Sequence, residues 1–336
     1  MNRFIECLIK KESSFKPVWF MRQAGRYLPE FNKIRSQNKN FIKLCLDSEL
    51  SSEITLQPIK RFDLDAAIIF SDILIIPHAL GQEVNFVKGE GPILEKLNVK
   101  NVLNIKDQEF LKKLRPVYNA ITITKKKLRK DKALISFVGA PWTILVYMLN
   151  LKTNENKFNL KSFKKSQNNI EELISKLIHV INLHIKSQKE AGADVVQIFD
   201  SWAGLLKNDN LKKFCYVPNS KIVKYSRHIN LPSICFPKGI GINYKNFIDI
   251  VMPDGISIDY DLDPMWAKNN LKGVCIQGGM NPKILLGNEN DVMKEVEKYL
   301  NIFKNNAYIF NLGHGILPNT DPNMIKKVVE KVINYK

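Results

Sequence analysis

Short runs of consecutive apolar residues recur along the chain, each followed by a polar or glycine-containing tip and a segment of helical length. There are eight such runs: 18–21, 66–70, 134–138, 195–199, 233–236, 255–258, 274–277 and 308–311. Residues that are apolar in succession are typical of strands buried on both faces of a parallel sheet. Eight strand–helix units with right-handed crossovers close into a ring. The pattern therefore predicts an α/β fold, a single (β/α)8 TIM-type barrel over residues 1–336, with its active-site cleft at the C-terminal ends of the strands.

Amphipathic segments separate the apolar runs. Residues 170–191, ended by Gly192, and residues 291–303 have the spacing of a helix with one apolar face. Another helix is expected after the last run, with Pro322 near its start. These helices would cover the outside of the barrel.

The connection from 72 to 134 is longer than the others and has room for a hairpin. We expect a strand over 83–87 that turns through Gly89 and Gly91. No Gly-x-Gly-x-x-Gly motif follows an early strand, as a doubly wound nucleotide-binding sheet would require. Nucleotide binding is therefore not expected.

Composition points to a soluble protein. The chain is 45% hydrophobic, enough for a large core, and its longest apolar stretch, 64–80, is interrupted by Asp65, Asp72 and other polar residues. The first seven residues lack the apolar region of a secretory signal. Five scattered cysteines, without Cys-x-x-Cys or His-x-Cys, are typical of reduced thiols and argue against a thiolate zinc site. We expect a cytoplasmic protein with no metal and no membrane partner.

The formal net charge is +18, from 51 basic and 33 acidic residues. Such a field attracts polyanions, which could be nucleic acid or a small poly-acid. The lysine-rich stretch 125–130 is typical of a solvated helix face, and no nucleic-acid-binding signature accompanies it. Nucleic acid is therefore not the expected partner.

Arginine is rare among the basic residues, with eight in the whole chain, and two of them lie four residues apart after the first run. These are Arg22 and Arg26. A guanidinium binds a carboxylate or phosphate through two parallel hydrogen bonds, which lysine cannot do. The pair indicates either a site for an anionic small molecule or two surface arginines on a turn.

Polar residues follow every predicted strand, and in a barrel these tips meet at one mouth. The tips contain Arg22, Gln23 and Arg26; Ser71 and Asp72; residues 139–143; residues 200–204; residues 237–239; Asp259 and Tyr260; Gln277 and Gly278; and residues 311–315. This convergence, rather than any one tip, predicts the functional site.

Several of these residues have a structural reading beside the functional one. Asp72 follows a nearly unbroken apolar run, where a carboxylate needs a cation or N–H donors, but it could also cap the next segment. His314 lies between two glycines that permit close approach of a ligand, although a lone histidine is often structural. Tyr147 could belong to a helix core, and Ser201 could cap a helix.

Two motifs carry a family likeness. Residues 22–30 (RQAGRYLPE) and 139–143 (GAPWT) resemble the pair of signatures of the uroporphyrinogen decarboxylase family. The similarity continues through 70–74, 199–204 and 310–318, and it extends from about Arg3 to the C-terminal helix.

The resemblance implies a barrel that works as a homodimer, without metal or organic cofactor. The family removes four acetate carboxyl groups from uroporphyrinogen III, giving coproporphyrinogen III and CO2 on the route to haem. By position, the resemblance assigns catalytic roles to Asp72, Arg22 and Arg26, and substrate binding to Arg22, Gln23, Ala24, Gly25, Arg26, Asp72, Tyr147, Ser201 and His314. The chain departs from the family pattern at 277–282 and at His78, outside these contacts.

The chemistry agrees with this assignment. Uroporphyrinogen carries eight carboxylates around a ring with four inward N–H donors, so a binder needs an anion at the centre and cations at the rim. Protonation of a pyrrole carbon gives a cation that accepts the electrons of the C–CO2 bond, and the substrate thus replaces a cofactor. Asp72 would stabilise that cation by about 3–4 kcal/mol. Arg22, Arg26 or a water that they hold would deliver protons, although the high pKa of arginine disfavours it as an acid.

Three other readings remain at this stage. Corrinoid-linked methyltransferases of the same barrel superfamily use thiolate zinc, which requires a His-x-Cys motif that Cys235 and Cys275 lack. A basic nucleic-acid-binding protein would show salt-dependent affinity for DNA or RNA. A tetrapyrrole carrier would bind the octa-acid without releasing CO2.

Overall fold

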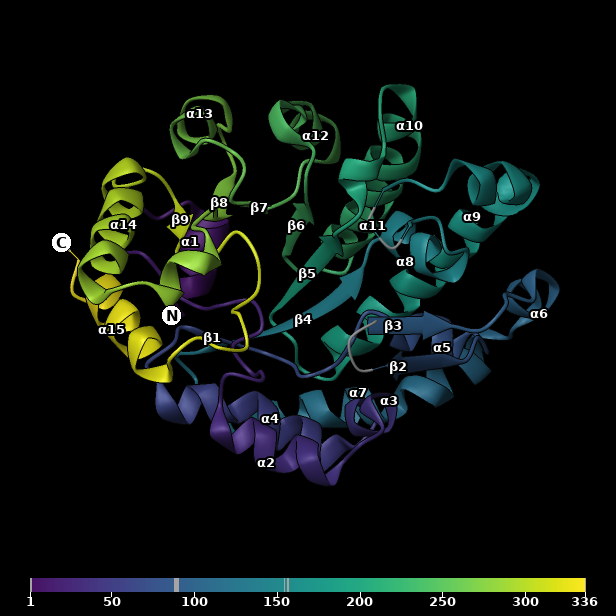
Figure 1. Ribbon diagram of the computed structural model, residues 1–336, viewed down its shortest axis with the longest axis horizontal. Helices are drawn as coiled ribbons and strands as arrows, with labels where there is room; N and C mark the ends of the chain where they lie inside the picture. Colours follow the sequence, from purple (N-terminus) through teal and green to yellow (C-terminus); the bar gives the residue numbers. More distant parts are fainter. Residues whose placement is uncertain (1, 88–90, 154, 156, 336) are drawn as a thin grey trace.

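The computed structural model describes residues 2–87, 91–153, 155 and 157–335. Strands and helices alternate along the chain, and the helices surround a central curled sheet (Figure 1). The strands are β1 (Ala66–Ile68), β2 (Val84–Val87), β3 (Gly91–Leu94), β4 (Ala133–Gly139), β5 (Val195–Asp200), β6 (Ser233–Pro237), β7 (Gly255–Ile258), β8 (Cys275–Gly278) and β9 (Tyr308–Ile309). The helices of eight or more residues are α1 (Arg3–Lys10), α2 (Pro29–Gln37), α4 (Ser48–Arg61), α7 (Asp107–Lys127), α8 (Pro141–Met148), α9 (Leu160–Glu190), α11 (Val217–His228), α12 (Tyr244–Val251), α14 (Glu289–Ile302) and α15 (Pro322–Ile333).

Shorter helical segments fill the connections. They are α3 (Phe41–Cys45), α5 (Ile75–Ala79), α6 (Val99–Asn104), α10 (Asp209–Leu211) and α13 (Pro264–Asn270), the 3₁₀ turns η1 (Ala203–Leu205), η3 (Gly241–Asn243) and η4 (Pro282–Leu286), and the π-helical turn η2 (Lys212–Tyr216). Within the described part of the chain, no helix is both long enough and apolar enough to cross a membrane.

Seven strands form one parallel sheet in the order β1-β4-β5-β6-β7-β8-β9. Neighbours in this order are also neighbours along the chain once the β2–β3 hairpin is left out, as expected for repeated strand–helix units. The sheet curls so that helices lie on its outer side (Figure 1). The prediction of buried parallel strands is thus confirmed for seven of the eight apolar runs.

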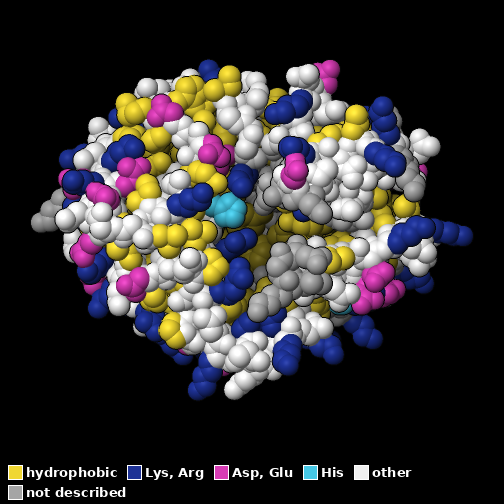
Figure 2. Space-filling model, viewed as in Figure 1, with side chains coloured by type: hydrophobic (Ala, Val, Ile, Leu, Met, Phe, Trp, Pro, Cys, Tyr) yellow, Lys and Arg dark blue, Asp and Glu magenta, His cyan; other side chains and the backbone are white. Residues whose placement is uncertain are grey.

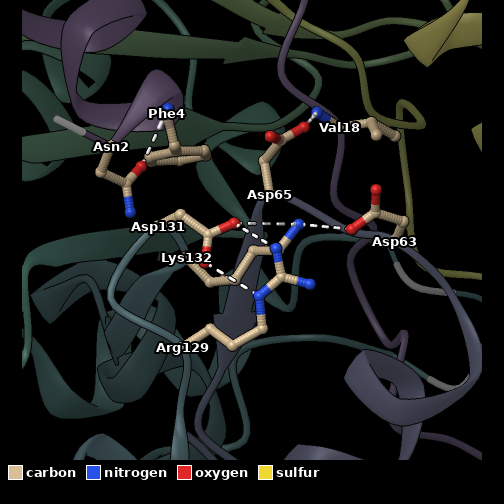
Figure 3. A network of polar contacts seen from close by, with 8 residues as sticks. All are labelled: Asn2, Phe4, Val18, Asp63, Asp65, Arg129, Asp131 and Lys132. Carbon is tan, nitrogen blue, oxygen red and sulfur yellow. Dashed lines mark hydrogen bonds and ion pairs between the residues drawn. The ribbon is translucent and has the colours of Figure 1, made fainter.

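The first run, 18–21, is the exception, because it forms one isolated bridge rather than a strand. Val18 pairs in parallel with Phe310, beyond the end of β9. On its other side, the Val18 N–H donates not to a backbone carbonyl but to the Asp65 carboxylate, at 2.8 Å (Figure 3). The Asp65 N–H in turn donates to the Val18 carbonyl at 2.9 Å. The first run is therefore not a regular strand in this structure, and the prediction of an eighth strand is not confirmed.

The Trp19 N–H donates to the Phe310 carbonyl at 3.3 Å, whereas two later N–H groups of the run are bound by side chains. Phe20 donates to the Gln23 side chain at 3.0 Å, and Met21 donates to the Asn311 side chain at 3.1 Å. Buried backbone donors must find an acceptor, and these amide oxygens supply it without a strand neighbour. The run is therefore held between β9 and β1 in an irregular conformation that can turn sharply at residue 22.

The apolar core has two parts. The larger part lies between the sheet and the surrounding helices. The smaller part lies inside the curl of the sheet, where Phe4, Cys7 and Leu8 of α1 pack with side chains of the strands. A Cβ added at Gly255 would lie 2.8 Å from Leu8 Cδ1, so α1 packs directly on the first residue of β7. Helix α1 therefore covers the N-terminal end of the curled sheet and leaves its C-terminal end for a site.

Polar contacts support the N-terminal end of β1 and β4 (Figure 3). Lys132, whose side chain is 7% exposed, lies 2.6 Å from Asp63 and 3.9 Å from Asp131. Asp65, on the same segment as Asp63, binds the first apolar run as described above. These contacts fix β1, and with it the residues that follow at its other end.

The predicted hairpin is present, with β2 and β3 paired antiparallel from Val84 opposite Leu94 to Val87 opposite Gly91. The predicted turn residue Gly89 lies outside the described residues. Helix α9 contains residues 170–190 of the predicted segment and begins ten residues earlier, capped by the Asn159 side chain. The helices predicted over 291–303 and after Pro322 correspond to α14 and α15.

Candidate active site

Arg22 lies on the loop after the first apolar run, with a φ of 62°. A side chain in this left-handed region costs about 1–2 kcal/mol, so the surroundings must hold it there. The fully buried Gln23 does so, since its amide accepts from the Phe20 N–H at 3.0 Å and donates to the Ala66 carbonyl of β1 at 3.1 Å. Gln23 therefore positions Arg22, and its own polar atoms are used within the protein.

The loop after β9 lies against the stem of Arg22. A Cβ at Gly315 would lie only 2.3 Å from Arg22 Cδ, and the Ile316 N–H donates to the Met21 carbonyl at 2.9 Å. The lack of a side chain at Gly315 lets the arginine cross the backbone of this loop. The arginine and His314, which precedes this glycine, are thereby brought together.

Asp72 follows β1 and is half-buried. Its Oδ1 accepts a hydrogen bond from the Leu74 N–H at 2.8 Å, so the capping role suggested by the sequence is present. Burial raises the pKa of Asp72 to about 6, while the Leu74 N–H and the positive charge of Arg22 oppose that rise. The capping role and proximity to a guanidinium therefore coexist in one residue.

Arg22 is influenced by three other predicted site residues. Burial and then the charge of Arg26 lower the pKa of Arg22, whereas Asp72 and Tyr147 act in the opposite direction. The Arg22 side chain is nevertheless exposed to solvent. A charged group that is accessible and yet densely surrounded by protein is one that lies in a cleft.

Tyr147 lies near the end of α8, which begins directly after the tip of β4. Its ring contacts that of Trp202 edge to face, with the ring centres 6.0 Å apart. Burial raises the pKa of Tyr147, and the charge of Asp72 adds to the rise. The hydroxyl is therefore neutral at physiological pH and can serve as a hydrogen-bond donor beside Asp72.

His314 completes this group from the loop after β9. Burial, followed by the charges of Lys238 and Arg22, lowers the pKa of His314 to about 4. Its Nδ1 accepts from the Gly315 N–H at 2.8 Å, which assigns the ring proton to Nε2. His314 is thus a neutral hydrogen-bond donor in the cleft at pH 7.

The remaining predicted site residues occupy less central places. Ser201 is half-buried in the turn directly after β5, and Ala24 and Gly25 are half-buried in the arginine loop. A Cβ at Gly25 would lie 2.7 Å from the Arg22 carbonyl oxygen, and the Gly25 carbonyl accepts from the Leu28 N–H at 2.9 Å. Gly25 therefore shapes the loop between the two arginines. No electrostatic or hydrogen-bond contact within the described residues links Ser201 to Arg22.

At other strand tips, the polar side chains form hydrogen bonds within the protein itself. Asp200 is 1% exposed and accepts from Thr143 at 2.7 Å and from Asn219 at 3.0 Å. Gln277 is fully buried, accepts from the Trp19 indole at 2.8 Å and donates to the hydroxyl of the β7 serine at 2.6 Å. The mouth is therefore formed by fewer residues than the sequence suggested.

No motif in the sequence assigns a role to Lys238. It follows β6, is half-buried, and its charge acts on His314. Its only sequence signal is its position at a strand tip before a glycine, and that signal does not distinguish it from other tip residues.

Thiolate metal binding finds no support in the geometry. In the part of the chain that the structure describes, no three His, Cys, Asp or Glu side chains are arranged to hold a metal ion. Burial raises the pKa values of Cys235 and Cys275, which keeps both as thiols.

A separate cavity of about 400 Å³ lies between the segment 206–216 and the region of η3 and α12. Of the strand-tip residues only Gly239 lines it, and none of the nine site residues implied by the family resemblance does. Figure 2 instead shows a hollow near the middle of one face, with hydrophobic side chains in its depth and Lys, Arg and one His side chain along its rim.

A family model described as uroporphyrinogen decarboxylase (URO-D) matches residues 1–335. A uroporphyrinogen decarboxylase of Orientia tsutsugamushi (strain Ikeda) is 41% identical over 346 residues, covering 100% of this chain and 99% of that protein. The protein of the same name from Rickettsia bellii (strain RML369-C) is 40% identical over 333 residues, covering 98% and 97%.

Among solved structures, a methyltransferase from Methanosarcina mazei superposes with a TM-score of 0.79 and covers 98% of this chain and 97% of its own. The two sequences are 18% identical. At this identity the likeness shows a shared fold and says nothing about a shared reaction.

Proposed function

The chain belongs to the uroporphyrinogen decarboxylase family, and we propose that its cleft removes the four acetate carboxyl groups of uroporphyrinogen III to give coproporphyrinogen III. The enzyme is a carboxy-lyase of tetrapyrrole biosynthesis. The observation that carries the assignment to this cleft is the position of Arg22, whose charge acts on Asp72 after β1 and which is itself acted on by the charge of Arg26.

The substrate has two kinds of polar group, and the cleft offers a partner for each. The four pyrrole N–H groups point inward, where the Asp72 carboxylate can accept them. The acidic arms point outward, toward Arg22 and Arg26, whose planar guanidiniums bind carboxylates through paired hydrogen bonds. The neutral Tyr147 and His314 add hydrogen-bond donors without adding charge.

Each decarboxylation replaces one CO2 by one proton. Protonation of a pyrrole carbon creates a cation, and the electrons of the bond to the departing carboxyl flow into that cation as CO2 leaves. A second proton converts the resulting exocyclic methylene into a methyl group, while the ring carbon returns its proton. Asp72 stabilises the cation because it is ionised above its pKa of about 6, an effect of about 3–4 kcal/mol for one well-placed group.

Proton delivery is proposed for Arg22 or a water that it holds. An ordinary guanidinium is too weak an acid, but burial and Arg26 lower the pKa of Arg22, which is the direction that general acid catalysis needs. His314 has the opposite character, since a pKa of about 4 leaves it unprotonated at neutral pH.

We also propose that the first apolar run closes the curled sheet into a (β/α)8 barrel that forms one domain over the chain. Hydrogen bonds on both sides of the run support this, to Phe310 on one side and to Asp65 on the other. Five buried cysteines without disulfides support the cytoplasm as its compartment.

A homodimer is the oligomeric state that we propose from the family resemblance. Three apolar side chains that follow β6, β7 and β8 are available for such an interface: Ile242, Met265 and Leu286. Light scattering on the purified protein tests this proposal, and a monomer at micromolar concentration would contradict it.

The activity is tested by anaerobic incubation with uroporphyrinogen III, followed by oxidation and chromatography of the products. The expected result is stepwise conversion from eight to four carboxyl groups. Asp72→Asn is the matched control, because it removes charge and little volume, and we expect it to lose at least about 100-fold in kcat. A wild-type protein that binds the substrate but releases no CO2 would show a carrier instead.

A further inference from the structure

We propose that Lys238 binds a carboxylate of the substrate together with His314, and so forms a cationic subsite separate from the arginine pair. This inference rests on the proposed function, since it names a further binding residue of the same cleft. The residue comes from the loop after β6, whereas Arg22 and Arg26 come from the loop after the first apolar run.

The backbone of Lys238 is fixed on both sides. Its N–H donates to the Asp200 carbonyl at 3.1 Å, and its carbonyl accepts from the Gly204 N–H at 3.0 Å. Gly204 and Gly239 are in backbone contact, because a Cβ at Gly204 would lie 2.8 Å from the Gly239 carbonyl oxygen. Lys238 therefore starts from a rigid position between the tips of β5 and β6, as a binding residue needs.

The tips of β6 and β9 are connected through the tip of β7. The Gly239 N–H donates to Asp259 Oδ2 at 2.7 Å. On the other side of this tip, a Cβ at Gly313 would lie 2.3 Å from the Tyr260 nitrogen, so the two backbones are in direct contact. Lys238 and His314, which adjoin these glycines, are consequently held on one part of the rim.

The charge of Lys238 acts on His314. It lowers the pKa of His314, which places the ammonium group within electrostatic range of the imidazole. Lys238 makes no ion pair with any residue of the described ranges. Asp259, the nearby buried carboxylate, is already occupied by the Gly239 N–H, the Tyr244 hydroxyl and the Asp261 N–H.

An ammonium beside a neutral imidazole is a suitable pair for one carboxylate. The Nε2–H of His314 and the Nζ of Lys238 both donate, and the combined site carries a single positive charge. The two arginines cannot serve all the arms of a ring that bears eight carboxylates. A cation on a different loop would fix the orientation of the macrocycle as well as its affinity, because it engages a different arm.

The variant Lys238→Met tests the subsite, because it removes the charge and keeps the length of the stem. Loss of a hydrogen bond to a charged group corresponds to about a 10- to 100-fold loss of affinity. We expect KM for uroporphyrinogen to rise at least about tenfold, with kcat changed less than about threefold, and Lys238→Arg to restore most of the loss. Lys207→Met is the control: this exposed lysine lines the separate cavity, and its removal should leave KM unchanged.

A second measurement distinguishes the subsite from a structural role. Removal of the positive charge should raise the pKa of His314 above its value of about 4 in the wild type, as read by NMR titration of the imidazole. An unchanged His314 pKa together with an unchanged KM would overturn the proposal even if the wild type is fully active.

Binding of uroporphyrin, the stable oxidised octacarboxylate, separates this inference from the proposed function. If the wild type does not decarboxylate uroporphyrinogen, the proposed function fails, but fluorescence titration with uroporphyrin still compares Lys238→Met with the wild type. A weaker affinity of the variant by about tenfold or more supports the subsite. Equal dissociation constants overturn it.

Discussion

Burial acts against the charges of both Asp72 and Arg22, and their proximity compensates. Desolvation raises the pKa of Asp72 to about 6 and lowers that of Arg22, while the opposite charge of each partner counteracts the other's shift. At pH 7 a carboxyl group with this pKa is ionised by about ten to one. The cleft thus keeps a reactive anion and a guanidinium charged in a place where either one alone would tend to lose its charge.

The raised pKa of Asp72 predicts the pH dependence of the reaction. In the proposed function the carboxylate is the form that accepts the pyrrole N–H groups, so kcat/KM should fall as the pH drops below about 6. The free energy of unfolding should change in the opposite direction. The Asp72 carboxyl binds its proton more tightly in the folded state than in the unfolded chain, so lowering the pH from 6 toward 4 should raise the free energy of unfolding.

Two measurements check this expectation. A pH profile of kcat/KM locates the acidic limb, and urea unfolding at several pH values compares the wild type with Asp72→Asn. The wild type should gain stability relative to the variant as the pH falls, because the amide has no proton to bind. An acidic limb near pH 4, without this relative gain, would show that Asp72 is not the titrating group.

Arg26→Lys tests whether the second arginine uses its planar fork. Lysine keeps the charge but offers no paired hydrogen bonds, so KM should rise about tenfold with little change in kcat. Steady-state kinetics checks this against Arg115→Lys, an exposed position in the middle of α7 where the same exchange should have no effect. An unchanged KM at residue 26 would mean that charge alone suffices there.

At the scale of elements, seven of the eight apolar runs correctly predicted a strand. A strand that is buried on both faces has apolar residues in succession, and this pattern is visible in the sequence. The first run has the same pattern but forms no regular strand, since Asp65, Gln23 and Asn311 bind three of its N–H groups. Asn311 is 290 residues from its partner in the chain. No local pattern reveals such pairings, and for that reason the irregular segment was not predicted.

The candidate site was predictable for a different reason. Arg22, Asp72 and His314 are polar residues at strand tips, and the family resemblance singled them out from the other tips. Gln23 belongs to the same motif, but its buried amide holds the loop to β1. A motif records which residues occur together and does not separate those that bind substrate from those that position the binders.

Gly313 is the residue on which the junction between the tips of β7 and β9 depends. A methyl group there would lie 2.3 Å from the Tyr260 nitrogen and 2.8 Å from the Asp259 carbonyl carbon, both backbone atoms. We expect Gly313→Ala to lower the free energy of unfolding by about 2–4 kcal/mol and to raise KM by displacing His314.

Urea unfolding and kinetics measure both effects, with Gly241→Ala as the control. Gly241 has a φ of 56° but no atom within 4 Å of an added Cβ, so only the backbone cost of about 1 kcal/mol should appear. Equal losses at the two glycines would show that the β7–β9 junction can shift to accept a side chain.

At the scale of the whole molecule, the chain has 51 basic and 33 acidic residues, and its proposed substrate is an octa-anion. The ion pairs on the surface are mostly exposed, such as Lys113 with Glu109, and such pairs contribute less than about 1 kcal/mol each to stability. Lys and Arg side chains are spread over the face that contains the hollow (Figure 2). We therefore expect the net charge to act chiefly as a long-range field on the proposed substrate.

This field predicts a salt dependence that is set by the charge of the substrate. Steering of a charged ligand weakens as ions screen the field, and the Debye length falls from about 30 Å at 0.01 M salt to about 3 Å at 1 M. For uroporphyrinogen, kcat/KM should therefore fall by roughly an order of magnitude over this range, while kcat changes little. The same series with the five-carboxylate intermediate is the matched control, because it uses the same cleft with three fewer negative charges and should show a shallower slope. Equal slopes for the two substrates would mean that salt acts only on the contacts inside the cleft, and the surplus lysines would then have no part in capture.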